Sequence, residues 1–196
     1  MIFAALQALL PDFKDPDLVR HTADGGYSMG WASVMQGRLS GSTPCGTIIV
    51  GVGDSRRRDD GIGPYIVERL EAILNISDAF RFFSVPGLTF DILGELQSAD
   101  GAILIDSTAD ILEQGWRCET VMPGAGFMHL RMKHLNPAFA SGFSHYLCHR
   151  NPPAWVLSVQ GDDFGFGEGL TPAARKRVEK AFSHMVERVL RIHEKC

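Results

Sequence analysis

The chain has 196 residues, enough for one well-buried domain, and its composition of 45% hydrophobic and 21% charged residues is typical of a globular protein. Its formal net charge of -4 gives polyanions no electrostatic reason to bind, which argues against nucleic acid as a partner. The sequence has no run near the roughly 20 apolar residues of a membrane helix and no N-terminal signal peptide, so we expect no membrane insertion and a cytoplasmic location.

Residues 1–46 differ in character from the rest of the chain. The apolar stretch at residues 3–10 can form two amphipathic helical turns, which we expect to dock on the protein's own domain. A segment rich in Gly, Ser and Thr follows, without a sustained period. We therefore expect an irregular N-terminal arm or extension of unknown role at 1–46 and an α/β domain at 47–196.

A regular alternation of strands and helices begins at Thr47. Residues 47–53, TIIVGVG, form a short β-branched run ended by glycine, as in a buried parallel strand. A helix should follow, with Pro64 at its first position. Its apolar residues recur at helical spacings on one face: Tyr65, Ile66, Leu70, Ile73 and Leu74.

The next unit repeats this pattern. Strands are predicted at 79–85 and at 101–107, where the second strand ends in Asp106, and a turn and helix at 86–97 lie between them. Three strands with two helical crossovers fit a βαβαβ arrangement.

The last third of the domain adds two strands and a closing helix. Residues 117–122 are predicted as an antiparallel edge strand, and residues 154–160 as a late buried strand. In the closing helix at 171–195, Thr171 can act as cap and Pro172 can take the first position. The apolar residues of this helix recur every three or four positions: Val178, Phe182, Met185, Val189 and Ile192. The fold class is therefore α/β, a three-layer α/β/α sandwich whose sheet is mostly parallel with one antiparallel edge.

Acidic residues follow two of the predicted parallel strands. Asp59 and Asp60 lie in the loop after the first strand, and right-handed crossovers bring this loop to the same sheet edge as Asp106. Carboxylates facing one crevice repel each other unless a cation or a shared proton lies between them. Each acid can also be purely structural. Asp59 and Asp60 can stabilise a helix N-terminus, and Asp106 can accept hydrogen bonds from backbone N–H groups.

The glycines after the first strand suggest a dinucleotide site, but the fingerprint fails. Gly51 and Gly53 are present, whereas Arg56 stands where GxGxxG requires its third glycine. The arginines at 56–58 can hold a phosphate or a carboxylate, or they can form a solvated loop. The four cysteines contain no CxxC pair, so we expect reduced thiols rather than a zinc site or a disulfide framework.

Five motifs, in this order, resemble the nickel-iron hydrogenase maturation endopeptidases, most nearly the formate hydrogenlyase branch. They are GVGDSRRRDDGIGP, VPGLTFDILGEL, AILIDST, KHLNP and VQGDDFGFGEGLTP, and they extend from about Thr47 to the C-terminal helix. The resemblance implies a phosphorylase/hydrolase-like fold. It also implies a metal-dependent processing endopeptidase that removes a C-terminal peptide from the precursor of the hydrogenase large subunit.

The resemblance implies three metal-contacting, catalytic residues: Asp60, Asp106 and His134. His134 is favoured over the nearby His129, His145 and His149 because it lies 28 residues after Asp106 and leaves room for one helix before residue 154. Two oxygens and one imidazole suit a borderline divalent ion. The nickel is expected to arrive with the substrate, and zinc or cadmium could replace it in a crystal.

The remaining positions matched by the resemblance are predicted to contact substrate: Gly53, Asp54, Asp59, Gly61 and Gly87. Relatives usually carry Asn where this chain has Asp54, which can be a further ligand, a proton acceptor or a helix cap. The alternative function is a non-proteolytic metal-sensing or scaffold protein of the same fold that binds a nickel-loaded partner. The sequence leaves the oligomeric state open.

Overall fold

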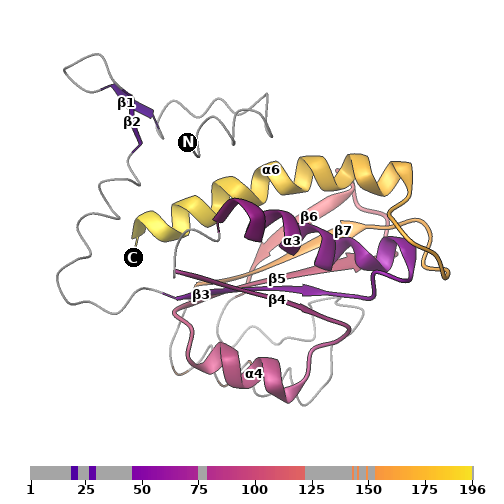
Figure 1. Cartoon of the computed structure of the whole chain (residues 1–196), viewed down its shortest axis with the longest axis horizontal. Coiled ribbons are helices and arrows are strands. Elements are labelled where there is room, and N and C mark those ends of the chain that lie inside the picture. Colours follow the sequence, from indigo (N-terminus) through magenta and orange to yellow (C-terminus); the bar gives the residue numbers. More distant parts are fainter. Residues whose placement is uncertain are drawn as a thin grey trace.

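The structure is a computed structural model that describes residues 19–21, 27–29, 46–74, 79–121, 143, 145, 149 and 153–195. Its main sheet has five strands in the order β4-β3-β5-β7-β6 (Figure 1). These strands are β3 (Thr47–Val52), β4 (Phe80–Val85), β5 (Gly101–Thr108), β6 (Trp116–Thr120) and β7 (Ala154–Gln160). The helical elements are η2 (Arg58–Gly61, a 3-10 turn), α3 (Ile62–Leu74), α4 (Phe90–Gln97) and α6 (Pro172–Lys195).

The sheet is parallel except at one edge. β3 pairs in parallel with β4 and with β5, and β5 pairs in parallel with β7, whereas β6 pairs antiparallel with β7. Every residue of β3 and β5 is buried, as expected for parallel strands covered on both faces. The predicted sheet, with its antiparallel edge strand, is confirmed.

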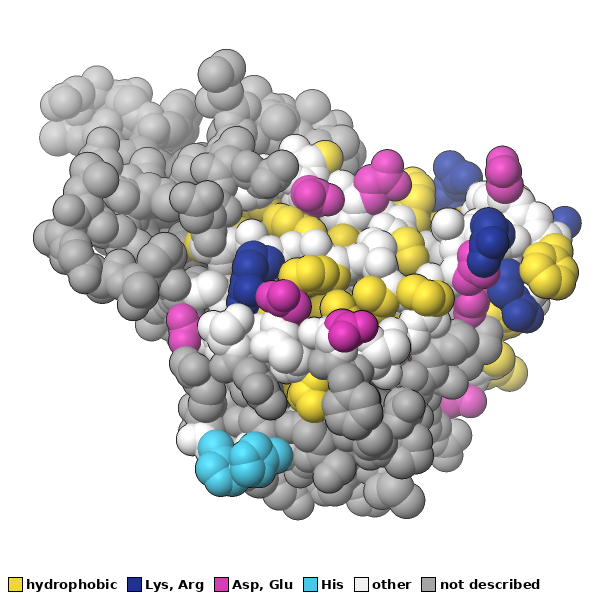
Figure 2. Space-filling view, turned by 60° about the horizontal axis from the view of Figure 1, so that its bottom comes forward, with side chains coloured by type: hydrophobic (Ala, Val, Ile, Leu, Met, Phe, Trp, Pro, Cys, Tyr) yellow, Lys and Arg dark blue, Asp and Glu magenta, His cyan; other side chains and the backbone are white. Residues whose placement is uncertain are grey.

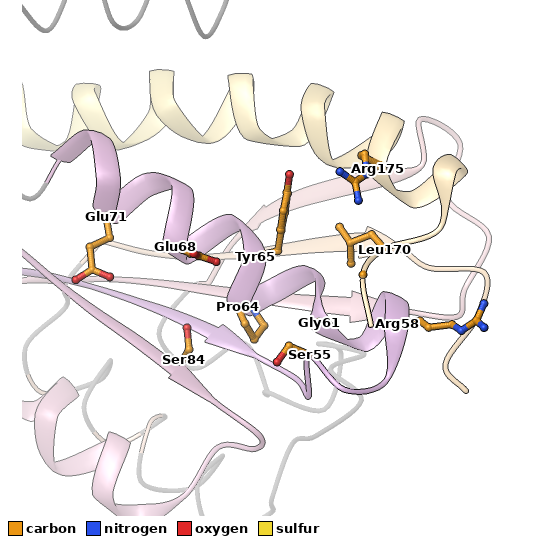
Figure 3. Close-up of a pocket in the computed structure, with 11 residues that line it drawn as sticks. Ser55, Arg58, Gly61, Pro64, Tyr65, Glu68, Glu71, Ser84, Leu170 and Arg175 are labelled. Atoms are coloured by element: carbon orange, nitrogen blue, oxygen red, sulfur yellow. The ribbon is translucent and has the colours of Figure 1, made fainter. Parts of the chain in front are cut away.

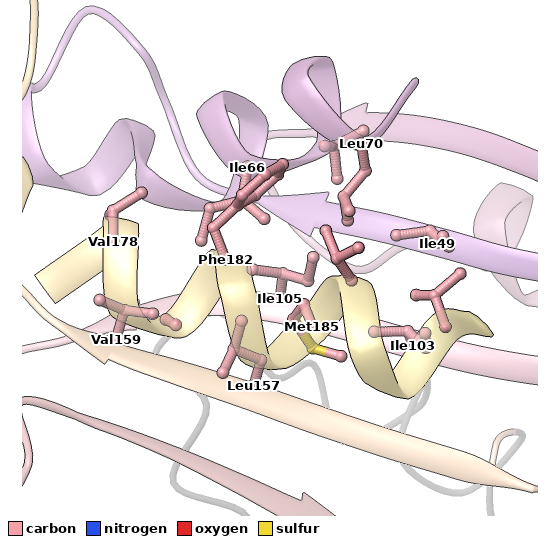
Figure 4. Close-up of a cluster of buried hydrophobic side chains, with 14 of the residues drawn as sticks. Ile49, Ile66, Leu70, Ile103, Ile105, Leu157, Val159, Val178, Phe182 and Met185 are labelled. Carbon is pink, nitrogen blue, oxygen red and sulfur yellow. The ribbon is translucent and has the colours of Figure 1, made fainter. Parts of the chain in front are cut away.

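Helices cover both faces of this sheet and produce two buried apolar clusters. α3 and α6 lie on one face and α4 lies on the other (Figure 1). Ile66 and Leu70 of α3 pack with Phe182 of α6 against inward-facing residues of the central strands (Figure 4). The second cluster joins α4 to the opposite side of β3, β5 and β7. The predicted three-layer sandwich is therefore confirmed.

Helix α6 begins where its capping signal predicts. The Ala174 N–H donates to Thr171 Oγ1 at 3.2 Å, and Pro172 is the first helical residue. A side-chain oxygen at this position satisfies one of the unpaired N–H groups of the first turn. The predicted apolar face is buried at Val178, Phe182, Met185 and Val189, while the side chain of Ile192 lies outside the described part.

Two predicted boundaries are wrong. α3 begins at Ile62 and follows directly on η2, so Pro64 is the third helical residue rather than the first. The 3-10 turn already gives the chain a helical path, because its C-cap residue Ile62 has αR dihedral angles. β5 continues two residues beyond Asp106, since Thr108 still pairs with Gln160 of β7.

The N-terminal region contains one short ladder. β1 (Val19–His21) and β2 (Tyr27–Met29) pair antiparallel, so an irregular arm is the wrong prediction for these six residues. The predicted helical turns at 3–10 lie outside the described residues. Residues 143, 145 and 149 are helical, in the segment where a helix was expected before β7.

Candidate functional site at the carboxyl ends of the strands

The end of β3, the turn η2 and the start of α3 meet at one edge of the sheet. Gly53 has a φ of +135°, and a Cβ there would collide with the Asp60 carbonyl oxygen. A Cβ at Gly63 would collide with the carbonyl of Val52 and lie 2.6 Å from that of Ile105. Only glycine permits these approaches. The glycines thus let the loop and helix start lie directly on the ends of β3 and β5.

Asp60 projects from this turn and is nearly fully buried, with 2% of its surface exposed. The backbone N–H of Asp54 donates to Asp60 Oδ2 at 3.1 Å. An N–H directed at one carboxylate oxygen fixes the orientation of the group and favours its charged form. The loop after β3 therefore positions the Asp60 carboxylate through its own backbone.

Asp106 lies on β5, the strand that contacts η2. It is 1% exposed and stands in register with Ser158 of β7. Since Asp60 belongs to η2, the structure brings the elements that carry both acids to the same edge of the sheet, as predicted. Within the described residues no group of three or more His, Cys, Asp and Glu is arranged to hold a metal ion. His134, the third predicted ligand, lies outside the described residues.

Asp59 has a different environment from its neighbour Asp60. It is 0% exposed, and its Oδ2 accepts hydrogen bonds from the N–H groups of Asp162 and Asp163 at 2.8 and 3.1 Å. The N–H of Thr171 donates to Oδ1 at 2.7 Å, and the hydroxyl of Thr171 donates to Oδ2 at 2.9 Å. Asp59 therefore joins η2 to the loop before α6 and to the cap of that helix.

The pKa of Asp59 reflects two opposing effects. Burial acts to raise this pKa because it disfavours the charged carboxylate, but the hydrogen bonds from Thr171, Asp162 and Asp163 outweigh burial and lower it. The carboxylate is consequently ionised at neutral pH. Its predicted contact with a substrate stays a prediction.

Asp54 forms a two-point ion pair with Arg56. The guanidinium donates from Nε to Oδ1 at 3.0 Å and from Nη2 to Oδ2 at 2.9 Å, and the backbone N–H of Arg56 also donates to Oδ1 at 3.0 Å. These side-chain and backbone hydrogen bonds lower the pKa of Asp54 to about 2. Asp54 therefore closes the turn that it begins, and the N-cap of η2 is Arg57 rather than Asp54. Its predicted contact with substrate stays a prediction.

The other two arginines of this loop contact the segment before α6. Arg57 donates from Nη2 to the carbonyl oxygen of Phe164 at 3.1 Å and lies over the ring of Phe166. Arg58 forms an ion pair with Asp163 at 2.9 Å. Basic, acidic and exposed hydrophobic side chains consequently lie together at one end of the molecule (Figure 2). The loop is therefore not simply solvated, because its arginines join two segments.

Gly61 and Gly87, both predicted to contact substrate, have different surroundings. A Cβ at Gly61 would lie 2.8 Å from Ser55 Cα, so the fold itself requires glycine there. A Cβ at Gly87 would meet no atom within 4 Å. Gly87 thus has open space beside it in the loop between β4 and α4, and its substrate contact stays a prediction.

A groove runs along the outward side of α3 (Figure 3). Its volume is about 380 Å³. Gly61, the residue after Asp60, forms part of its wall together with Ser55 from the loop after β3. One end of the groove therefore lies at η2, the turn that carries Asp60, and the groove extends along the helix.

The sequence did not reveal the connection made by Asp59 or the groove. Asp59 and Thr171 are 112 positions apart, and no local spacing links them. A partial signal existed, because both residues lie in motifs that carry the family resemblance and Thr171 was identified as a cap. Nothing in the pattern indicated that the two motifs bind each other.

Comparisons with known proteins identify the fold. The structure is similar to the hydrogenase maturating endopeptidase HybD from E. coli, with a TM-score of 0.57 and 19% identity over 74% of this chain and 93% of that chain. It is similar to the [NiFe] hydrogenase maturation protease HycI from Thermococcus kodakarensis KOD1, with a TM-score of 0.56 and 18% identity over 81% and 99% of the two chains. A hydrogenase 3 maturation protease gives a TM-score of 0.54 and 19% identity over 72% and 89%.

No protein-family model and no curated protein matches the sequence. The three solved structures nevertheless match from 72% to 81% of the chain. The chain therefore has the fold of the hydrogenase maturation endopeptidases.

Proposed function

We propose that this protein is an endopeptidase that removes a C-terminal peptide from the nickel-loaded precursor of a nickel-iron hydrogenase large subunit. The observation that carries the proposal is the pair of buried carboxylates, Asp60 and Asp106, on two contacting elements at the carboxyl edge of the sheet. Ligands of open α/β sheets bind at this edge. The proposal adds that the precursor belongs to the formate hydrogenlyase type and is processed in the cytoplasm.

In this proposal the nickel is part of the substrate, and Asp60, Asp106 and His134 contact it. Buried carboxylate oxygens fit such an ion, because two negative charges near each other are stabilised by a cation between them. A divalent ion at such a site polarises a carbonyl or lowers the pKa of a bound water. Zinc or cadmium would be accepted by the same donors in a crystal.

The chain's own residues orient the site. The Asp54 N–H holds one oxygen of Asp60, and Asp54 is in turn held by Arg56. Gly53 and Gly61 keep the loop close to the strand ends, and in the proposal they lie against the substrate backbone together with Gly87. This arrangement fixes the orientation of the Asp60 carboxylate before substrate binds, which reduces the entropy lost on binding.

The decisive experiment is a cleavage assay with the full chain. The purified protein is incubated with the hydrogenase large-subunit precursor encoded in the same genome, with and without nickel loading, and the precursor is followed by intact mass spectrometry. The proposal expects nickel-dependent loss of a C-terminal peptide. Binding of the precursor without a change in mass would instead support the metal-sensing or scaffold alternative.

Single substitutions test the three proposed contacts. Asp60→Asn, Asp106→Asn and His134→Ala are each expected to abolish processing, because each removes a donor to the nickel. The melting temperature should change by only a few degrees, since Asn keeps an acceptor for the Asp54 N–H and removes a charge from a like-charged pair. Thermal unfolding monitored by circular dichroism checks this, and collapse of the fold would make that residue structural.

His145→Ala is the matched control. His145 is exposed, and its ring stacks on that of His149 with centroids 3.8 Å apart. It lies on the helical segment before β7 and has no place in the proposed trio. Processing by this variant should equal that of the unsubstituted chain, and lost activity would show that the wrong histidine had been assigned.

A further inference from the structure

The groove along α3 is lined by one face of this helix and by neighbouring segments. Its helical wall residues are spaced by three or four positions, so their side chains lie in one row. The opposite face of the helix carries Ile62, Ile66 and Leu70, which are fully buried. The row is completed by residues from the loop after β3, the end of β4 and the start of α6. The wall comprises Ser55, Arg58, Gly61, Pro64, Tyr65, Glu68, Glu71, Ser84, Gly169, Leu170 and Arg175.

Opposite charges occupy the two ends of this groove. Glu68 and Glu71 lie toward the C-terminal half of α3, and Arg175 lies at the other end, beside the start of α6 (Figure 3). All three are exposed, and within the described ranges none of them forms an ion pair. Other arginines of the described part, such as Arg69 and Arg81, have carboxylate partners.

These three charges, which have no ion-pair partner among the described residues, all belong to side chains that line the groove. An exposed charge costs little without a partner because water solvates it. The two negative charges lie at one end of the groove and the positive charge lies at the other. A ligand whose charges have the opposite order is electrostatically complementary to the groove. Tyr65 and Leu170, both half-buried, supply apolar surface between the ends.

From this pattern we infer that the groove binds the C-terminal segment of the precursor as an extended peptide. The segment carries a basic side chain that lies against Glu68 and Glu71 and a carboxylate that lies against Arg175. The inference rests on the proposed function, because that function defines a C-terminal segment as the substrate. It adds a binding region outside the metal contacts and the charge pattern that a substrate needs.

The dimensions of the helix fit a short segment. Ten residues separate Gly61 from Glu71, which corresponds to about 15 Å along a helix. An extended chain advances about 3.3 Å per residue, so four or five residues span this length. Gly61, the residue after Asp60, lines one end of this stretch, so that end of a bound peptide lies at η2, the turn that carries Asp60.

Charge reversal tests the inference on the full chain. Cleavage of the nickel-loaded precursor is measured for the double variant Glu68→Lys with Glu71→Lys and for Arg175→Glu. The KM of each variant should rise about tenfold, because charge reversal replaces an attraction between protein and peptide with a repulsion. The kcat should stay within twofold, because these charges do not act in the chemical step. This rise should shrink at high ionic strength. Glu113→Lys and Lys180→Glu, exposed charges away from the groove, should leave KM unchanged.

Complementary changes in the substrate separate recognition from structural damage. A precursor whose basic residues in the C-terminal segment are replaced by Glu should be cleaved poorly by the unsubstituted protein. The Glu68→Lys, Glu71→Lys variant should cleave it with a KM near the original value. A merely structural role of the glutamates would not produce this rescue.

The carboxylate can come from the chain end or from an acidic side chain. A fluorescent synthetic peptide copied from the precursor's C-terminal segment, bound to the full protein, distinguishes these sources by anisotropy. Weaker binding of the amidated peptide identifies the terminal carboxylate, and weaker binding after Asp→Asn or Glu→Gln exchange identifies a side chain. If neither change alters the Kd, the inference is wrong.

The two proposals fail differently. Cleavage with unchanged KM in the groove variants would overturn the groove and leave the endopeptidase intact. Peptide binding that depends on Arg175 without any cleavage would overturn the endopeptidase and keep the groove as a binding site. Absence of both binding and cleavage would overturn both.

Discussion

Asp59 and Asp60 are adjacent acids with separate tasks. Asp59 accepts four hydrogen bonds from the segment between β7 and α6, whereas the Oδ2 of Asp60 accepts the backbone N–H of Asp54 from the loop after β3. The first residue connects two parts of the fold, and the second is held in place at the sheet edge. Asp59 thus acts as an anchor beside a candidate ligand, Asp60, and the anchor keeps η2 against the loop before α6.

Replacing Asp59 by Asn should destabilise the protein. An amide offers one acceptor oxygen and places an NH2 group against a donor, so at least one buried N–H, such as that of Thr171, loses its partner. Such a loss costs about 1–3 kcal/mol. Urea unfolding at pH 7 measures the change, with Glu113→Gln, an exposed acid, as the control. A stability equal to that of the unsubstituted protein would show that these hydrogen bonds contribute nothing net.

The same variant has a predicted pH dependence. The folded-state pKa of Asp59 is lower than its ordinary value of 3.8, so its contribution to stability is complete above that value. The contribution disappears as the pH falls through the folded-state pKa, when the carboxylate is protonated. As the pH is lowered from 3.8 through the folded-state pKa, the unsubstituted protein should therefore lose more unfolding free energy than Asp59→Asn. Parallel profiles for the two proteins would contradict this assignment.

At the scale of elements, two helical glycines should respond oppositely to alanine. Gly63 in α3 lies against the carbonyls of Val52 and Ile105, and a methyl group cannot enter there without displacing backbone. Gly94 in α4 is exposed and has nothing within 4 Å of its Cβ position. Gly63→Ala should cost about 1–3 kcal/mol and impair processing, while Gly94→Ala should gain up to about 1 kcal/mol.

Equilibrium urea unfolding of both variants checks this pair of predictions. Gly94→Ala also serves as the control, because it makes the same chemical change in a helix on the other face of the sheet. If Gly63→Ala were neutral, the start of α3 would be able to shift away from the strand ends. The close approach that defines the site would then not be a requirement of the fold.

Sequence patterns predicted elements whose signals are local. α6 combines a cap at Thr171, a proline at its first position and a regular apolar face, and all three are found in the structure. The start of α3 was placed two residues late, because η2 is held by Asp59 through contacts with a segment over one hundred residues away. The sheet edge that carries Asp60 and Asp106 is predictable from sequence, because it follows from the strand topology alone. The groove is not predictable in this way, because it depends on the packing of α3 beside α6.

At the scale of the whole molecule, the described core lies entirely within the α/β domain. The two buried clusters extend from Ile48 to Val189, and the described part of the domain begins at Gly46. The Gly46 N–H donates to Asp100 Oδ2 at 3.2 Å, and the Asp100 N–H donates to the Gly46 carbonyl at 2.8 Å. This reciprocal pair fixes the entry of β3 into the sheet, and the domain boundary between 46 and 47 stays a prediction.

Removal of residues 1–45 tests that boundary. Residues 46–196 retain both clusters and the Gly46–Asp100 pair, so we expect one cooperative unfolding transition with a melting temperature within a few degrees of the full chain. Removing two more residues eliminates the anchor and the first residue of β3, and should lower the melting temperature further. If the shorter cut already abolished the transition, residues 1–45 would belong to the folding unit. Retained folding with lost precursor cleavage would instead assign the N-terminal arm to substrate binding.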